Sequence, residues 1–179
     1  MSGPINSATR RLPTVPASLA GQGIGVRART EADEAFLRTL YVSIRWHEVE
    51  PLIDWTQDQK LAFLAGQFAL QRDHYDTAFA DCVFAIIEHG GEPIGRLYLD
   101  RADPAETRVV DIAFLPQWCG RGLGTAFLRH IQDEARAEGA KVSIHVENDN
   151  PARRLYGRLG FEDVERRGIY WLMRWGAIS

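Results

Sequence analysis

The chain has 179 residues, and its composition of 45% hydrophobic and 25% charged residues excludes a disordered or fibrous protein. The formal net charge of −3 gives no overall basic field, so nothing in the composition favours a nucleic-acid partner. Two cysteines without CxxC spacing, and no run near the roughly 20 apolar residues of a membrane helix, lead us to expect a cytoplasmic protein with no metal or membrane partner.

The first residues, 1–23, are rich in Pro, Ser and Gly and contain no long apolar core of a signal peptide. We expect them to form a flexible tail. A single domain is expected over 24–179, because that length suffices to bury a core without disulfides. This domain opens with an alternating segment, 24–29, that predicts the first strand.

Two helices are predicted next, and each has a recognisable start. Thr30 and Asp33 resemble a capping box, and apolar residues at helical spacing extend this helix to about Trp46. Thr56 and Gln59 mark the start of the second helix in the same way. The chain therefore begins its ordered part with one strand and two helices.

Strands dominate the middle of the chain. The segment "CVFAIIEHGGEPIGRLYLDR" has two apolar runs around "HGGEP" and predicts a hairpin. The segment "ETRVVDIAFLP" predicts a third strand, which Pro116 ends. A helix over 123–138, terminated by Gly139, then leads to a strand at 140–147 and to a short helix capped by Asn150.

One or two strands over 162–175 close the chain. This order of elements indicates an α+β fold: a mixed, mostly antiparallel sheet with one central βαβ unit and helices on both faces. The closing segment carries Tyr170, Trp171 and Trp175, which belong either to the core or to the interface of a homodimer.

Three glycines, Gly120, Gly122 and Gly124, alternate immediately before the amphipathic helix. A P-loop is excluded because its lysine is missing, and a dinucleotide-binding fingerprint fits poorly because Thr125 replaces the third glycine. Two interpretations remain. One is a glycine-rich turn between strand and helix; the other is a pyrophosphate site built from bare amides and the helix dipole, with Arg121 adding positive charge.

Two segments resemble motifs of the GNAT N-acetyltransferase superfamily. "FLPQWCGRGLGTAFL" resembles its pyrophosphate-binding motif, and "VENDNPARRLYGRLGF" resembles its second motif, an Asn-capped helix that carries Ala-x-x-Leu-Tyr and ends in Gly-Phe. The resemblance covers about 24–175 and is strongest over 107–161. Cys119 departs from it, because the family has Arg or Gln at that position. We interpret Cys119 as a tolerated replacement, with a redox or regulatory thiol as the alternative.

This resemblance implies acetyl-CoA as co-substrate. Its pyrophosphate is expected on the amides of Gly120–Thr125, and its pantetheine arm is expected to pair with an open strand edge, as an added strand does. The implied cofactor-binding residues are Ile112, Ala113, Phe114, Leu115, Cys119, Gly120, Arg121, Gly122, Leu123, Gly124, Thr125, Asn150, Arg153 and Tyr156.

Tyr156 matches the family position of the general acid. Acyl transfer requires a proton for the leaving thiolate, and a tyrosine hydroxyl can supply one. Helical phase predicts a buried face formed by Ala152, Leu155 and Leu159, with Tyr156 at its margin. The alternative is that the tyrosine ring only packs at the rim of the core.

The base is predicted less directly. Ser143, His145 and Glu147 share one strand face, and His145 stands where some family members carry a carboxylate. Asp111 and Glu106 on the preceding strand are alternatives, and loss of the amine proton to water needs no dedicated residue.

The segment "RWHEVEPLIDW" between the first two helices typically forms a wall of the acceptor site in this family. Trp46, Glu48, Glu50 and Trp55 are therefore expected to bind a cationic amine, unless the tryptophans only pack in the core. The sequence thus predicts an N-acetyltransferase acting on a small-molecule amine. A protein or peptide N-acetyltransferase, or a non-catalytic acyl-CoA-binding module, is the alternative.

Overall fold

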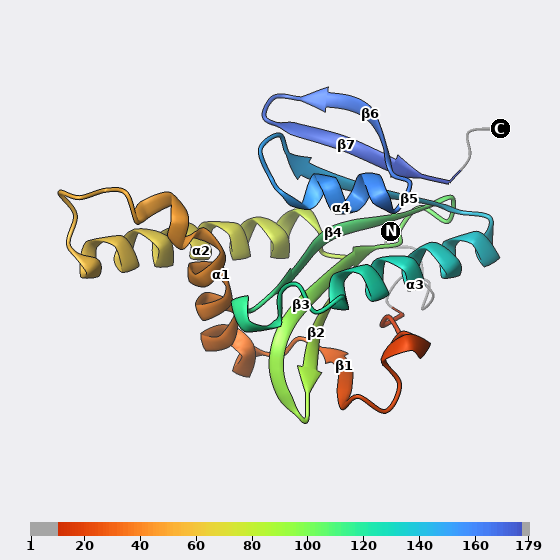
Figure 1. The fold of residues 1–179 in the computed structure, drawn as a ribbon, viewed down its shortest axis with the longest axis horizontal. Helices are drawn as coiled ribbons and strands as arrows, with labels where there is room; N and C mark the ends of the chain where they lie inside the picture. Colours follow the sequence, from red (N-terminus) through yellow and green to blue (C-terminus); the bar gives the residue numbers. More distant parts are fainter. Residues whose placement is uncertain (1–10, 177–179) are drawn as a thin grey trace, which may run out of the picture.

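A seven-stranded sheet with the order β1-β2-β3-β4-β5-β7-β6 forms the centre of the computed structural model, which describes residues 11–176 (Figure 1). All neighbouring strands are antiparallel except β4 and β5, which are parallel. The strands are β1 (Ile24–Ala28), β2 (Val83–His89), β3 (Glu92–Asp100), β4 (Glu106–Phe114), β5 (Lys141–Glu147), β6 (Glu162–Arg167) and β7 (Tyr170–Trp175). The helices are α1 (Glu34–Val49), α2 (Gln57–Ala78), α3 (Leu123–Glu138) and α4 (Ala152–Arg158).

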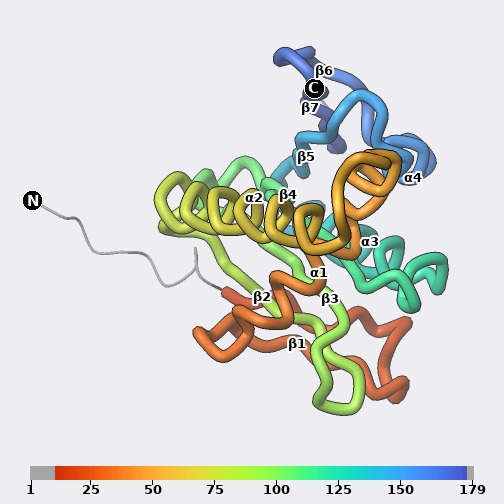
Figure 2. The backbone as a smooth tube through the Cα atoms, turned by 90° about the vertical axis from the view of Figure 1, so that its left-hand side faces the viewer, coloured from red at the N-terminus to blue at the C-terminus, as the bar shows by residue number. Residues whose placement is uncertain are grey.

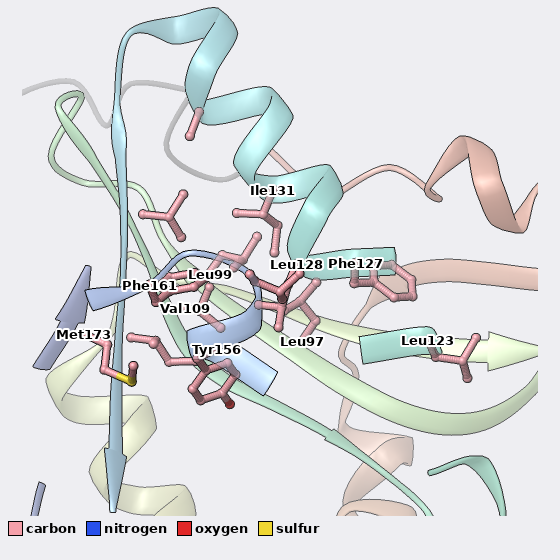
Figure 3. Close-up of a cluster of buried hydrophobic side chains, with 14 of the residues drawn as sticks. Leu97, Leu99, Val109, Leu123, Phe127, Leu128, Ile131, Tyr156, Phe161 and Met173 are labelled. Atoms are coloured by element: carbon pink, nitrogen blue, oxygen red, sulfur yellow. The ribbon is translucent and has the colours of Figure 1, made fainter. Parts of the chain in front are cut away.

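Helices cover both faces of this sheet, as the element order predicts. Figures 1 and 2 show α1 and α2 on one side and α3 on the other. The larger hydrophobic cluster joins α3 and α4 to the strands, and Figure 3 shows Phe127, Leu128 and Ile131 at its centre. A smaller cluster joins α1 and α2 to Ile86 of β2. The prediction of an α+β fold with one βαβ unit is confirmed.

Local signals set the starts of the first two helices. Thr56 and Gln59 form the reciprocal bonds of a capping box at α2, at 2.8 and 3.2 Å. Thr30 and Asp33 form a second capping box. It begins a short 3₁₀ turn, Glu31–Asp33, which leads directly into α1. Arg27 of β1 binds both oxygens of Asp33 at 2.6 and 2.7 Å and holds the pKa of that carboxyl at about 2. This ion pair joins the first strand to the first helix.

The segment predicted as a tail lies only partly within the described residues. Its later part folds onto the body, where Leu19 enters the larger hydrophobic cluster. Thr14 Oγ1 also lies 2.7 Å from Nε2 of His130 on α3. The composition of this segment did not reveal that a single leucine finds a buried position against the sheet.

The closing strands are only partly buried. Trp171 and Trp175 pack against the larger cluster, whereas Tyr170 is exposed, so the homodimer stays a prediction. Among residues 11–176, no helix combines the length and the apolar composition needed to cross a membrane.

Gly95 of β3 permits the close approach of β4. A Cβ atom built at Gly95 would lie 2.6 Å from both Ala113 O and Phe114 Cδ1, and the first of these is a backbone atom. Gly25 of β1 is also a strand glycine, but its nearest neighbour would be a flexible Glu88 side chain at 3.7 Å.

We therefore expect Gly95→Ala to lower the free energy of unfolding by about 1–3 kcal/mol, because β4 must shift. Gly25→Ala is the matched control and should change it by less than about 1 kcal/mol. Urea titration of both variants measures the difference. Equal stability of the two variants would show that the contact between β3 and β4 is not tight.

Candidate active site

A cleft of about 850 Å³ lies on the face of the sheet that carries α1 and α2. Its floor is formed by β3, β4 and β5, and its walls by α1, α2 and the start of α4. The lining residues with ionisable or hydroxyl side chains on these elements include Tyr41, Arg45, Glu48, Tyr75, Arg96, Arg108, Asp111, His145, Glu147 and Tyr156.

The cleft forms because β4 and β5 separate. Their parallel pairing covers four residue pairs and ends at Val109 and Ile144. Beyond that point β4 continues to pair with β3, so its opposite edge has no strand partner within the described residues. A bulge in β4 at Val110, where the register with β3 shifts, marks the start of the open edge.

Two of the four strand-end residues predicted to bind pantetheine, Ile112 and Ala113, line the cleft. Phe114 is buried in the larger hydrophobic cluster, under the open edge. The amide of Leu115 donates to Ile94 O of β3 at 2.9 Å, so Leu115 and, two residues earlier, Ala113 turn their backbone groups toward β3. The backbone groups of Ile112 and Phe114 therefore face the open edge.

The segment Gly120–Gly124, called the glycine segment below, links this edge to the start of α3. Gly120 and Gly122 have φ values of +72° and +81°, a conformation that favours glycine, and Gly122 is the N-cap of α3. The next three amides, those of Leu123, Gly124 and Thr125, belong to the helix turn that has no acceptor within the helix. Arg121 lies over the Trp118 ring at 4.9 Å. Free amides, the helix dipole and one guanidinium therefore meet at this loop.

Cys119 stands between the open edge and these amides. Its thiol is exposed and lies 3.6 Å from the carbonyl oxygens of both Phe114 and Leu115. The other cysteine, Cys82, is buried, and burial raises the pKa of its thiol to about 12. Cys119 is therefore the thiol that reagents can reach.

Tyr156 lies deeper than the sequence predicts. It is 6% exposed and belongs to the larger hydrophobic cluster, whereas Leu155, predicted to be buried, is half-buried (Figure 3). The prediction of a marginal Tyr156 was wrong because its ring packs with Phe161 inside this cluster, with the ring centroids 6.0 Å apart. Burial, together with the nearby carboxylate of Asp111, raises the pKa of the Tyr156 hydroxyl well above its usual range. It is a phenol at neutral pH.

Two neighbouring side chains hold Asp111 in place. Its Oδ2 accepts from Arg96 Nη2 at 2.6 Å and from Tyr75 Oη at 3.0 Å. Arg96 is only 4% exposed, lies over the Tyr98 ring and also donates to Gln71. Two donors thus already occupy Oδ2, which argues against Asp111 as the proton acceptor.

His145 is better suited to accept a proton. Its ring lines the cleft, and its buried Nδ1 has no hydrogen-bond partner among the described residues. Burial lowers its pKa, and the charges of Arg108 and Arg167 lower it further, so the ring is neutral at pH 7. Glu106, the other alternative, already accepts from Ser143 Oγ at 2.6 Å and lies 3.1 Å from Arg174 Nε.

The predicted acceptor wall is only partly present. Glu48 lines the cleft and shares the guanidinium of Arg45 with Glu147 of β5. Trp46 instead packs against the smaller hydrophobic cluster. Trp55 and Glu50 are not among the residues that line the cleft; the Trp55 ring packs on Phe63 at 5.4 Å, and Glu50 O accepts from Lys60.

Two predicted cofactor-binding residues of the second motif, Asn150 and Arg153, lie in different surroundings. Asn150 lines the cleft and accepts from the amide of Ala152 at 2.9 Å, which caps α4. Arg153 forms a bidentate ion pair with Asp163 of β6 at 2.7 and 3.0 Å and lies over the Trp171 ring. If Arg153 binds a cofactor phosphate, its guanidinium must therefore contact both the phosphate and Asp163.

Sequence reasoning missed Arg45, Tyr75, Arg96 and Arg108. One signal was available: Arg96 interrupts the otherwise apolar strand "IGRLYLD", and a buried charge needs a partner. Among the described residues, no group of three or more His, Cys, Asp or Glu side chains could hold a metal ion.

Known proteins share this architecture. PaiA N-acetyltransferase from Thermoplasma acidophilum, solved in complex with coenzyme A, superposes with a TM-score of 0.61 at 14% identity, over 84% of this chain and 97% of that chain. YncA from Salmonella typhimurium, solved with its cofactor acetyl-CoA, gives a TM-score of 0.52 at 19% identity, over 86% and 93% of the two chains. At these identities the likeness shows the fold.

Sequence comparison gives a more specific result. The chain is 39% identical over 74 residues to the N-alpha-acetyltransferase RimI of Mycobacterium tuberculosis, a match that spans 41% of this chain and 46% of that relative. The sequence pattern of the acetyltransferase (GNAT) family matches residues 41–161, which contain the open edge, the glycine segment and α4. The chain therefore belongs to the acetyltransferase (GNAT) family.

Proposed function

We propose that the protein transfers an acetyl group from acetyl-CoA to a primary amine. The observation that carries this proposal is the open edge of β4 beside the free amides that begin α3. The solved relatives that contain coenzyme A or acetyl-CoA support the choice of cofactor. The two free cysteines fit a reducing compartment, so we also propose a cytoplasmic location, with residues 24–179 acting as one domain.

In this proposal the cofactor spans the two features. Its pyrophosphate lies on the amides of Gly120–Thr125, and Arg121 adds a charge. Its pantetheine amides pair with the backbone of Ile112 and Phe114, whose amide and carbonyl groups face the edge without a strand partner. Backbone groups make most of these contacts, which explains why Cys119 can replace the usual Arg or Gln.

The reaction then proceeds by direct attack of the amine on the thioester. The nitrogen forms a bond to the carbonyl carbon, His145 accepts the proton that the nitrogen loses, and the C–S bond breaks as the tetrahedral intermediate collapses. The sulfur leaves with the bonding pair and receives the proton of Tyr156. Burial, together with the charge of Asp111, keeps Tyr156 protonated until the thiolate forms.

Two kinds of acceptor fit this chemistry. The volume of the cleft is in the range of small-molecule sites, which supports a small-molecule amine. The match to a relative named N-alpha-acetyltransferase favours the α-amine of a protein or peptide as the second candidate. A non-catalytic acyl-CoA-binding module would not need the hydroxyl of Tyr156.

Gly122 provides a test of the cofactor site. Gly122→Ala puts a methyl group on a left-handed residue beside the proposed pyrophosphate, so we expect the Kd of acetyl-CoA to rise about tenfold or more. Gly139→Ala is the matched control: it ends the same helix with φ +69° and equally open space around the added Cβ. Calorimetric titration measures the Kd of acetyl-CoA for both variants, and equal Kd values would contradict the proposed pyrophosphate site. Millimolar acetyl-CoA should also raise the Tm of the wild type.

Removal of the Tyr156 hydroxyl tests the acid. Tyr156→Phe should lower kcat by about 100-fold, the usual range for a general acid, and leave the Kd of acetyl-CoA within about twofold. Tyr170→Phe, in a tyrosine that also lines the cleft, is the control. Steady-state thiol release measures both. Full turnover in Tyr156→Phe would remove this residue from the mechanism. A wild type that binds acetyl-CoA but turns over no amine would favour the binding-module alternative.

The pH profile tests the base. Because the pKa of His145 is lowered from 6.5, the ring is neutral at pH 7 and becomes protonated only at more acidic pH. We expect kcat/KM to fall on the acid side with an apparent pKa below 6.5, and His145→Gln to lose about 100-fold in rate together with this dependence. His47→Gln, which changes another histidine of the cleft, should keep the wild-type profile. An unchanged profile in His145→Gln would exclude the assigned role.

A further inference from the structure

The charges that line the cleft are unevenly partnered. Arg45 is bound by Glu48 and Glu147, Arg96 by Asp111, and Arg167 by Glu165 outside the cleft. Arg108 of β4 is the exception among the lining arginines of the described chain, since no carboxylate lies within ion-pair distance of it. Its guanidinium lies over the Phe79 ring at 5.1 Å, so a stacking contact holds it in position.

Buried nitrogen atoms without a hydrogen-bond partner line the cleft. Among the described residues they are Arg96 Nε, Arg108 Nε and His145 Nδ1. Arg96 lies at the level of Ala113 and is bound through Nη2 to Asp111 and Gln71, whereas Arg108 lies at the level of Asp100 and Ser143. An arginine Nε carries hydrogen and can only donate. The described residues therefore offer Arg108 Nε no acceptor oxygen, and leaving a buried donor unpaired is unfavourable.

At the opposite end of the cleft, carboxylates outnumber the guanidinium groups that bind them. Two carboxylates, those of Glu48 and Glu147, share the single guanidinium of Arg45. Asp149 also lines the cleft, and within residues 11–176 its carboxylate accepts only from the side-chain amide of Asn148. An excess of negative charge suits an ammonium group that approaches from solvent.

The strand register separates these two ends. Arg108 is paired with Ser143 at one level of β5, and Glu147 lies four residues further along the same strand. Ser143, His145 and Glu147 share one face of β5, so His145 lies between the cationic and the anionic end. Along the cleft, the guanidinium of Arg108 without a carboxylate partner therefore comes first, the neutral imidazole of His145 second, and the excess of carboxylates last.

We propose that the acceptor is an amine that also carries a carboxylate, with the carboxylate bound by Arg108 and the amine presented beside His145. This inference rests on the proposed acetyl transfer and specifies its acceptor. A free amino acid and a peptide with an acidic side chain next to its α-amine share this chemistry. The stacked guanidinium is the group that would select both over a neutral amine.

Matched acceptors test the proposal on the wild-type enzyme. We would measure thiol release with glycine and glycinamide, and with the amidated dipeptides Ala-Asp and Ala-Asn, at saturating acetyl-CoA. The carboxylate member of at least one pair should have the higher kcat/KM by about ten- to a hundredfold, as expected for a charge-assisted hydrogen bond. A preference in the first pair assigns a free amino acid, and a preference in the second assigns a peptide.

Variants of Arg108 identify the group responsible. Arg108→Gln should abolish the preference by raising the KM of the carboxylate member alone, and Arg108→Lys should restore part of it. Arg129→Gln, which removes an exposed arginine of α3, is the control and should keep the wild-type preference. Circular dichroism of each variant verifies folding, and the wild-type comparison holds even if Arg108→Gln does not fold.

Two results would overturn the proposal: equal kcat/KM within both pairs, or an equal loss for both members in Arg108→Gln. If no amine is turned over although acetyl-CoA binds, the proposed function fails. The ligands N-acetylglycine and N-acetylglycinamide, titrated with coenzyme A present, then test the site by itself. Tighter binding of the carboxylate that is lost in Arg108→Gln supports it, and equal binding refutes it.

Discussion

The parallel pairing of β4 and β5 ends after four residue pairs, and the functional elements lie where it ends. A strand that loses its neighbour leaves backbone donors and acceptors unpaired, which is unfavourable unless water or a ligand bonds to them. Here the open edge runs from Val110 toward the start of α3. It therefore offers an extended, amide-containing ligand the hydrogen bonds of a missing strand, with an anion site at one end.

The two faces of the sheet differ in chemistry around this opening: one is packed with apolar side chains, and the other carries a polar cluster. On one face, α3 and α4 pack through aliphatic and aromatic side chains, which fix the glycine segment and Tyr156 relative to β4. On the other face, a polar group centred on Arg96, Asp111 and Tyr75 forms the floor of the cleft. Removing one partner of such a buried pair is strongly destabilising, so this floor is rigid as well as charged. The cofactor elements and the acceptor cleft thus meet at β4 from opposite sides.

Much of this arrangement could be predicted from local sequence. Capping boxes at Thr30 and Thr56, the "HGGEP" turn and the glycines before α3 act over a few residues, and their elements form as expected. The depth of Tyr156 could not be predicted, because it depends on how the short helix α4 packs against Phe161. Trp46 and Trp55 were expected near the acceptor because their segment typically walls that site in the family, yet their positions follow from the packing of α1 and α2. Pairs such as Arg45 with Glu147, 102 residues apart, have no local signal.

Amide hydrogen exchange with and without acetyl-CoA tests the central claim most directly, because it reads the backbone groups themselves. If the cofactor replaces a strand and its pyrophosphate lies at the start of α3, exchange should slow at Ile112, Phe114 and Gly120–Thr125. It should stay unchanged in the β6–β7 hairpin, which Figure 2 shows apart from these segments. Binding of acetyl-CoA that leaves those amides unprotected, with protection confined to other elements, would contradict the account.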